Sequence, residues 1–434
     1  MLHLESKAVR DALWSARFGL EREALRVTPE GRMARTPHPF PADDPRIVRD
    51  FCENQPEINT GVHDTPAAAV AELESIDAAL RATLAARPAP ERLWLYSNPP
   101  PLADEDDVPI ARFDGPRAGK TAYREHLAAR YGRRRMAFCG VHVNVSFGPS
   151  LLAADFAAAG GAGDLRRHAD ALYCELAARA AEAAWLLVAL MSASPVADAS
   201  LLGGGGGGGG LFAGFSSFRC SELGYWNDFV PVFDYTDAPS WARSVARHAE
   251  AGLIAAPSEL YYPVRLKPRG PNEPGALAEG GVDRIELRMF DLDPFATAGV
   301  DARDVAFAHL LLLRLAALPR TAHPARAQVA AVRNAKAAAR HDLRSATILH
   351  PDGRAEPVRD AARRALDGLA AFLSPLDPPP AVADALDFQR AKLETPGARR
   401  AERVLAALSG RDYPSAVLAL SAAAAAPVPE AARV

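Results

Sequence analysis

Two reactive residue types are scarce in this chain. Lysine occurs only five times in 434 residues, so arginine supplies nearly all of the positive charge. This imbalance, together with abundant alanine, is typical of coding bias and indicates no particular chemistry. The four cysteines include no CxxC pair, which argues against a structural zinc site. A chain of this length can bury an adequate core without disulfide bonds.

Long apolar runs are also lacking. The longest one near the middle covers 183–191, well short of the roughly 18 residues that a membrane span needs. The net charge is −3, and the short run Arg133–Arg135 is the densest basic patch, too little for a nucleic-acid footprint. The first residues are amphipathic and charged, unlike a signal peptide. We therefore expect a cytoplasmic protein that binds neither membranes nor nucleic acids.

The composition is that of an ordinary folded protein, with 49% hydrophobic and 24% charged residues. Its length predicts about two to three domains, or one large one. Hydrophobic periodicity predicts mainly helical structure after residue 301 and earlier helices over 1–16, 65–87, 121–131 and 164–191. Alternating patterns predict strands over 18–27, 49–60, 138–147, 259–267 and 284–291.

Eight consecutive glycines, Gly203–Gly210, match a dinucleotide-binding fingerprint only trivially. No predicted strand precedes them, and no helix with a distal acid follows. They also lack the Gly-Lys-Ser/Thr of a phosphate-binding loop. We interpret this run as a flexible low-complexity loop.

Two carboxylates share one side of the first predicted strand. Glu21 and Glu23 are two positions apart, which separates them by about 6.6 Å along a strand. Two acids this close repel each other unless a cation lies between them. A hard divalent ion such as Mg²⁺ would satisfy both. The alternative is a cross-strand ladder of ion pairs with arginines.

Further polar groups alternate with apolar ones on two other predicted strands. Asp50 and Glu57 are acids beside apolar neighbours, and Pro56 suggests a sheet edge or a bulge; charges that protect an edge strand are the alternative explanation. His142 projects beside Asn144 from the face opposite three valines. A lone histidine of this kind is more often structural than a ligand, so it gains meaning only together with the acids.

Arginines accompany the remaining candidates. Glu286 and Arg288 share one side of a strand, which suits phosphoryl transfer because that reaction needs a metal-binding carboxylate beside a cation. A simple ion pair is the alternative. Two more segments place arginine near tyrosine: Arg219 with Tyr225, and Arg265 with Tyr261. This combination suits recognition of a small zwitterion.

Taken together, these groups predict one chemistry. An antiparallel sheet would present them on a single face, where they fit a nucleoside triphosphate held through divalent ions beside a carboxylate substrate. A serine hydrolase is excluded because no GxSxG motif is present. The metal-capable set is Glu21, Glu23, Asp50, Glu57, His142 and Glu286.

Seven segments in this order resemble bacterial glutamate–cysteine ligases (γ-glutamylcysteine synthetases). They are FGLEREALRV, RDFCENQPEI, YREHLAARYG, GVHVNVSF, FRCSELGYWN, ELYYPVRLK and GGVDRIELRMFDLDPF. The resemblance runs from about residue 18 to 300, and the SNPP…DDVPIARF loop is most like the ligase half of bifunctional glutathione synthetases. It implies an α+β fold of the glutamine synthetase and guanido kinase group, in which an antiparallel sheet forms an open funnel with helices packed outside.

The resemblance also implies a reaction and its residues. ATP, a co-substrate, would phosphorylate the γ-carboxylate of glutamate, and the amine of cysteine would then displace phosphate in the first step of glutathione biosynthesis. The six metal-capable groups would bind Mg²⁺, with Mn²⁺ as an alternative. Arg288, helped by Arg124, would stabilise the transferring phosphoryl group, and Arg219 would bind the glutamate α-carboxylate. The remaining substrate-binding residues would be Tyr225, Tyr261, Phe51, Tyr123 and Arg265.

The chain also departs from that pattern. It ends before the ATP-grasp domain of the bifunctional enzymes, so we expect a dipeptide product. The glycine run precedes Arg219 and leaves the acceptor amine open. We expect a catalytic domain over 1–374 that contains the glycine-rich loop 203–210, a helical extension over 375–421 and a disordered tail over 422–434. The proline-rich loop 96–117 is a candidate lid that excludes water.

Three alternatives remain open. A γ-glutamyl ligase could use another amine or amino acid, because few side chains set the acceptor pocket. A non-catalytic paralogue would bind nucleotide and metal, although the complete ligand set and Arg288 argue against such decay. A guanido kinase is the weakest alternative, since it would need a reactive cysteine and all four cysteines are expected to be small buried hydrophobes.

Overall fold

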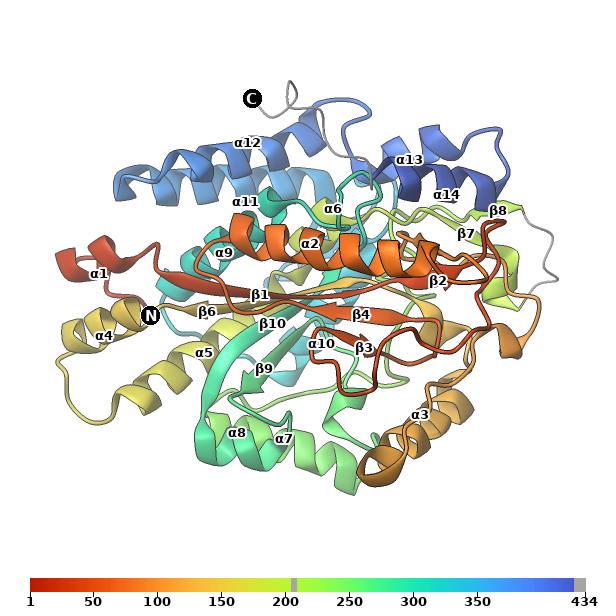
Figure 1. Cartoon of the computed structure of the whole chain (residues 1–434). Helices are drawn as coiled ribbons and strands as arrows, with labels where there is room; N and C mark the ends of the chain where they lie inside the picture. Colours follow the sequence, from red (N-terminus) through yellow and green to blue (C-terminus); the bar gives the residue numbers. More distant parts are fainter. Residues whose placement is uncertain (204–208, 425–434) are drawn as a thin grey trace.

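A curled antiparallel sheet forms the centre of the protein in the computed structural model, which describes residues 1–203 and 209–424 (Figure 1). Every neighbouring pair of strands in it runs antiparallel, in the order β3-β4-β1-β6-β10-β9. These strands are β1 (Ala16–Glu23), β3 (Ile47–Arg49), β4 (Pro56–Asn59), β6 (Val141–Phe147), β9 (Val264–Pro268) and β10 (Val282–Phe290). The predicted antiparallel sheet is therefore confirmed.

Helices cover one face of this sheet. The valines of β6 at 141, 143 and 145 are buried and belong to the main hydrophobic core, together with apolar residues of the covering helices. Those helices are α2 (Pro66–Ala85), α5 (Leu165–Glu182), α6 (Ala184–Met191) and α9 (Ala302–Ala317). Because side chains alternate along a strand, the residues between the valines face the opposite, open side.

Shorter elements complete the first three quarters of the chain. The additional strands are β2 (Leu25–Val27), β5 (Arg92–Trp94), β7 (Val196–Asp198) and β8 (Gly210–Phe212). Three-residue 3₁₀ turns interrupt the proline-rich loop at Glu105–Asp107 and Gly115–Arg117. The helices are α1 (Lys7–Ala12), α3 (Ala118–Tyr131), α4 (Pro149–Ala158), α7 (Ala238–Glu250) and α8 (Pro274–Gly280).

The last quarter is mainly helical. In it, α10 (Ala325–Ala338) packs against α5 and α6, whereas α11 (Val358–Leu373) and α12 (Pro380–Glu394) pack against α9 and are among the blue ribbons at the top of Figure 1. In the sequence, a small hairpin, β11 (Thr347–Leu349) with β12 (Ala355–Pro357), lies between the first of these helices and the other four. The helices are α10 (Ala325–Ala338), α11 (Val358–Leu373), α12 (Pro380–Glu394), α13 (Arg400–Leu408) and α14 (Tyr413–Ala423). In the described part of the chain, no helix is long and apolar enough to cross a membrane.

Several predicted elements have different bounds. The helix expected over 1–16 covers only α1, because β1 already begins at Ala16. The strand expected over 49–60 is two strands joined by a loop, and that over 259–267 begins only at Val264. The long helix over 164–191 is broken at Ala183. Pro56 marks neither a bulge nor an edge: it opens β4, which lies between β3 and β1.

Two predictions concern segments that lie wholly or partly outside the described residues. Of the glycine run, Gly203 ends a 3₁₀ turn in a left-handed conformation and Gly210 begins β8, while 204–208 lie outside the described residues. The tail expected to be disordered begins too early at 422, because α14 continues to Ala423; residues 425–434 are not described. All four cysteines are buried free thiols, as expected.

Candidate active site

The open face of the sheet forms the floor of a cavity of about 330 Å³. Acidic side chains enter it from β1, β4 and β10, and His142 enters it from β6; the helix α3 and the 258–267 segment close its sides. All but one of the predicted site residues line this cavity, namely Glu21, Glu23, Asp50, Phe51, Glu57, Tyr123, Arg124, His142, Tyr225, Tyr261, Arg265, Glu286 and Arg288. Arg219 lies in an adjoining pocket.

Three of the six metal-capable residues form one compact group. Glu21, His142 and Glu286 each offer a ligand atom, and these atoms lie within 4.8 Å of one another. The sheet register explains this convergence: Glu21 pairs with His142 across β1 and β6, and Glu286 pairs with Asn144 across β6 and β10. Asn144 donates a hydrogen bond from Nδ2 to Glu21 Oε1 at 3.1 Å and so orients that carboxylate.

The other three acids surround this group. Glu23 Oε1 lies 3.7 Å from His142 Nε2, and Glu23 Oε2 accepts a hydrogen bond from the Gly140 N–H at 2.9 Å. Asp50 and Glu57 line the same cavity outside the compact group. Within the described residues, no arginine forms an ion pair with Glu21 or Glu23, which contradicts the alternative of an arginine ladder.

Burial, with added repulsion between neighbouring carboxylates, raises the pKa of Glu23 and of Glu57. Burial raises the pKa of Glu23 to about 8, and the neighbouring Asp50 adds to this shift. Burial, followed by the charges of Asp50, Glu21 and Glu23, raises the pKa of Glu57 well above its usual value. A bound cation would reverse both shifts, because it favours the ionised carboxylates.

The pKa values of Glu286 and His142 are lowered instead. Burial acts to raise the pKa of Glu286, but the Arg288 and Lys267 charges outweigh it and hold that pKa well below the usual value. Burial and then Arg288 lower the pKa of His142 to about 4, so its imidazole is neutral, the form that coordinates metals. Arg288 Nη1 donates to Glu286 Oε1 at 2.9 Å, so the ion pair considered for these two residues does form.

Two buried atoms of this group lack a hydrogen-bond partner in the described structure. They are His142 Nε2 and Glu286 Oε2, which are the kinds of atom that bind divalent metals. Orphaned donors and acceptors are rare in a protein interior, because each costs desolvation free energy. The residues present therefore fit a divalent cation.

Arg124 and Arg265 line the cavity, but their guanidinium groups mostly bind backbone carbonyls. Arg124 donates to the carbonyl oxygens of Asp50, Arg49 and Lys120. Arg265 donates from Nη2 to the Ser258 carbonyl at 2.7 Å and from Nε to the Leu260 carbonyl at 3.1 Å. Both side chains thus brace the walls of the cavity.

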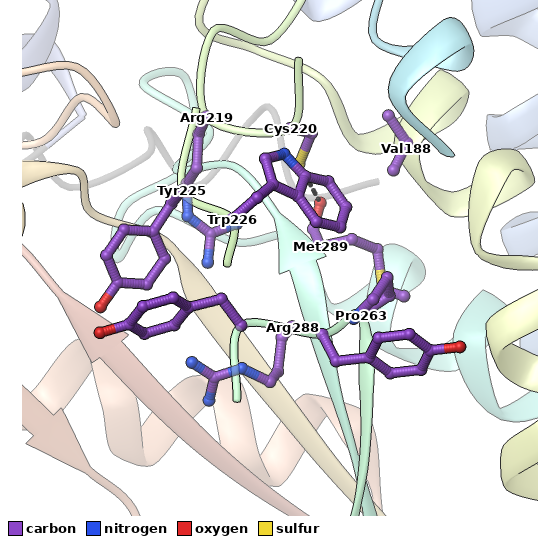
Figure 2. Close-up of a pocket in the computed structure, with 10 residues that line it drawn as sticks. Val188, Arg219, Cys220, Tyr225, Trp226, Pro263, Arg288 and Met289 are labelled. Atoms are coloured by element: carbon purple, nitrogen blue, oxygen red, sulfur yellow. Dashed lines mark hydrogen bonds between the residues drawn. The ribbon is translucent and has the colours of Figure 1, made fainter. Parts of the chain in front are cut away.

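Arg219 lies in a small adjoining pocket of about 40 Å³ (Figure 2). This pocket is lined by Arg288 and Tyr225, which also face the larger cavity, and by Trp226, Cys220 and Met289. Figure 2 shows the guanidinium group of Arg219 beside the Tyr225 ring and that of Arg288 lower on the same side of the view. The two pockets are therefore neighbouring parts of one site.

Aromatic side chains form the wall between these two spaces. The rings of Tyr225 and Tyr261 have centroids 4.1 Å apart. Tyr123 and Phe51 line the larger cavity with them. This wall gives an apolar surface with hydroxyl groups beside the carboxylate cluster, which suits a small amino acid with an apolar or thiol side chain.

Sequence reasoning missed several residues of the site. Lys267 lies on β9 with Nζ 3.8 Å from Glu286 Oε2 and lines the cavity. Two signals could have identified it: lysine is scarce in this chain, and Lys267 lies two positions after Arg265, on the same side of a strand. Gly140 could not be recognised from spacing: a Cβ there would lie 2.4 Å from Arg219 Cζ, so only glycine leaves room for the guanidinium.

Two solved structures share this architecture. A bifunctional glutathione synthetase from Pasteurella multocida superposes with a TM-score of 0.83 at 24% identity, covering 97% of this chain and 54% of that one. A glutamate–cysteine ligase from Francisella tularensis in complex with AMP superposes with a TM-score of 0.82 at 23% identity, covering 95% of this chain and 88% of that one. At these identities the likeness defines the class of fold.

Sequence comparison then defines the family. The family described as Glutamate-cysteine ligase matches residues 1–247 and 240–337, so the chain belongs to it, and the resemblance noted from the motifs is confirmed. The glutathione biosynthesis bifunctional protein GshAB of Listeria innocua is 33% identical over 386 residues, or 86% of this chain and 50% of that protein. GshAB of Enterococcus faecalis is 31% identical over 317 residues, or 72% and 41%. The chain spans about half the length of these relatives.

Proposed function

We propose that this protein joins the γ-carboxylate of glutamate to the amine of cysteine at the expense of ATP, the first step of glutathione biosynthesis. The observation that carries the proposal is the convergence of Glu21, His142 and Glu286 within 4.8 Å beside Arg288, in a chain of the glutamate–cysteine ligase family. A carboxylate is a poor electrophile, so it must first be activated, here as γ-glutamyl phosphate. Phosphoryl transfer between two anions needs cations around both.

A divalent metal fits the acidic group. The compact group would hold one ion, and Glu23, Asp50 and Glu57, which line the same cavity, would bind others. The mostly oxygen ligands favour Mg²⁺, and the single imidazole also allows Mn²⁺. When bound, the metal would neutralise the phosphate charge of ATP.

The chain's own cations would act on the substrates. Arg288 faces both pockets, so its guanidinium can contact the phosphoryl group as it moves from ATP to glutamate. Arg124 supports this step indirectly, because its hydrogen bonds hold the backbone that carries Asp50. Lys267 adds a further positive charge at the cavity wall.

The small pocket suits glutamate. Arg219 would bind the α-carboxylate bidentately, while the γ-carboxylate would point toward Arg288 and the acidic group. The aromatic wall of Tyr225, Tyr261, Tyr123 and Phe51 would take the cysteine side chain, since sulfur packs favourably against aromatic rings. Arg265 holds the segment before Tyr261 through its carbonyl contacts and so shapes this wall.

The fold group, the cellular location and a lid over the site are further parts of this proposal. We place the fold in the glutamine synthetase and guanido kinase group on the family resemblance. ATP and free Mg²⁺ are solutes of the cytoplasm, so we place the reaction there. The 96–117 loop contacts the segment that carries Phe51, a residue of the cavity: the Ala111 N–H donates to the Phe51 carbonyl at 3.0 Å, and the Arg112 N–H donates to Glu53. Such contacts suit a lid over a water-sensitive intermediate.

The decisive experiment is ADP release in the presence of ATP, Mg²⁺ and glutamate, scanned over candidate amines. We expect release that depends on cysteine, with γ-glutamylcysteine identified by mass. Release only with another amine or amino acid would replace cysteine as the acceptor and keep the mechanism. Tight ATP binding without release for any amine would indicate a non-catalytic paralogue and contradict the proposal.

A further inference from the structure

A buried acid outside the reaction cavity connects three segments of the chain. Asp291 follows β10 directly, and 4% of it is exposed. Its Oδ2 accepts hydrogen bonds from the Ala193 N–H at 2.9 Å and from Ser194 Oγ at 2.7 Å. Its Oδ1 accepts one from Ser217 Oγ at 2.9 Å. Asp291 thus ties the end of β10 to the turn after α6 and to the loop that carries Arg219.

The contact with Ser217 reaches the backbone at Arg219. Ser217 Oγ accepts a hydrogen bond from the Cys220 N–H at 3.0 Å, directly after Arg219. The Arg219 carbonyl accepts a further bond from the Tyr225 N–H at 3.2 Å. The side chain is held from the same end of β10, because Arg219 Nη1 donates to the Phe290 carbonyl at 3.4 Å.

This network fixes Arg219 relative to Arg288. Arg288 lies on β10, three residues before Asp291, so the strand end that carries Arg288 also contacts Arg219 through the Phe290 carbonyl. A buried carboxylate is costly unless its hydrogen bonds are satisfied. Asp291 uses both oxygens on the two loops, and none of its contacts is with a residue expected to bind the metal.

We propose that Asp291 is a positioning residue for glutamate recognition: through Ser217 and the adjoining Phe290 carbonyl, it sets the separation between Arg219 and Arg288. This inference rests on the proposed function, in which these two arginines face the two carboxylates of glutamate. The separation then selects the length of the dicarboxylate. Aspartate is one methylene shorter, and a single methylene changes the preference between substrates only about 10–200-fold, so small shifts of Arg219 change the selection.

The test compares Asp291→Asn and Ser217→Ala with a matched control. Asp170→Asn is suitable, because Asp170 is also a buried acid and accepts the Val282 N–H at 2.7 Å at the opposite end of β10. We expect both test variants to raise the glutamate KM about tenfold or more. The ratio of kcat/KM for glutamate to kcat/KM for aspartate should fall by at least the same factor. The KM for ATP should stay within about twofold, and the control should change neither value.

A double variant adds a second criterion. If Asp291 acts through Ser217, combining the two substitutions should raise the glutamate KM little beyond either one alone. Additive effects, an unchanged preference for glutamate, or equal changes in the KM of glutamate and ATP would overturn the proposal. If Asp291→Asn does not fold, Ser217→Ala decides the question, because it keeps the buried carboxylate.

The failure of this inference can be distinguished from failure of the proposed function. Without cysteine-dependent turnover by the unsubstituted protein, the proposed function fails. Calorimetric binding of glutamate in the presence of Mg²⁺ and a non-hydrolysable ATP analogue then still measures the role of Asp291. Weaker glutamate binding by both variants supports positioning, and unchanged binding contradicts it.

Discussion

At the scale of single residues, Gly140 contacts both an acid of the site and the Arg219 side chain. Its N–H binds Glu23, and the space where a Cβ would lie is filled by the Arg219 guanidinium. We predict that Gly140→Ala displaces Arg219 and raises the glutamate KM about tenfold or more, with little change in the KM for ATP. Gly119→Ala is the control, because no other atom lies within 4 Å of a Cβ built there on α3. Equal kinetics for the two variants would refute this role.

Glu21 provides the test of the metal group. Glu21→Gln keeps the shape of the side chain but removes a negative ligand from the group with His142 and Glu286. We expect the Mg²⁺ concentration needed for half-maximal ADP formation to rise about tenfold or more, while the glutamate KM changes little. Glu250→Gln, at the exposed end of α7, serves as the control. A change confined to the glutamate KM would show that β1 binds the amino acid instead.

The sequence predicted which residues line the site better than it predicted which of them lie close together. Alternation along a strand placed Glu21 and Glu23 on one side correctly, because the period of two is a property of any strand. It could not tell that Glu21, His142 and Glu286 form the compact group, since this depends on the order and register of β1, β6 and β10. The backbone contacts of Arg124 and Arg265 depend on loop geometry, which spacing does not encode.

At the scale of secondary-structure elements, long periodic patterns were the most predictable. The helix expected over 65–87 is α2, which begins after Thr65 with Pro66 in its first turn and with the Thr65 side chain accepting the Ala68 N–H. The helix expected over 164–191 breaks at Ala183, where the sequence carries no proline or glycine. The strand expected over 49–60 is divided into β3 and β4, and the loop 50–55 between them contains no glycine or proline that would mark the break.

A buried ion-pair network joins α9 to the C-terminal helices. Asp304 on α9 accepts hydrogen bonds from Lys392 on α12 at 2.6 Å and from Arg400 on α13, and Arg400 also pairs with Asp293. All four side chains are less than 10% exposed. This network attaches 380–408 to the rest of the protein, whereas the division into a catalytic domain over 1–374 and an extension over 375–421 stays a prediction.

Removing the central acid should therefore be costly. We predict that Asp304→Asn lowers the free energy of unfolding by about 3–5 kcal/mol, because it removes the acidic partner of buried Lys392 and leaves buried Arg400 paired with Asp293 alone. Asp367→Asn is the control: its pair with Arg390 is exposed and is worth at most about 1 kcal/mol. Urea unfolding followed by circular dichroism measures both. Similar small losses for the two variants would mean that the network does not anchor these helices.

At the scale of the whole molecule, stability in acid depends partly on His309. This side chain is buried against Phe18 and Phe147, and burial lowers its pKa to about 4. The unfolded chain takes up a proton near pH 6.5, but the folded protein does so only near pH 4. The histidine therefore removes stability as the pH falls through this window.

The variant His309→Leu isolates this contribution, because every other titrating group is common to both proteins. Between pH 6 and 4.5, we expect the free energy of unfolding to fall less steeply with decreasing pH for the variant than for the unsubstituted protein. The two slopes should differ by roughly 1.4 kcal/mol per pH unit, the value for one proton. Urea unfolding at several pH values provides the measurement. Parallel pH profiles would contradict a neutral buried His309.

The central claim concerns the whole assembly of sheet, acids and arginines: ATP activates the glutamate γ-carboxylate before the amine attacks. Isotope transfer tests it most directly. With glutamate labelled with oxygen-18 in its γ-carboxylate, phosphoryl transfer makes a labelled oxygen the bridge to phosphorus, and attack by the amine on the acyl carbon expels phosphate with that oxygen. The account predicts one labelled oxygen in each phosphate released together with γ-glutamylcysteine; phosphate free of label during product formation would contradict it.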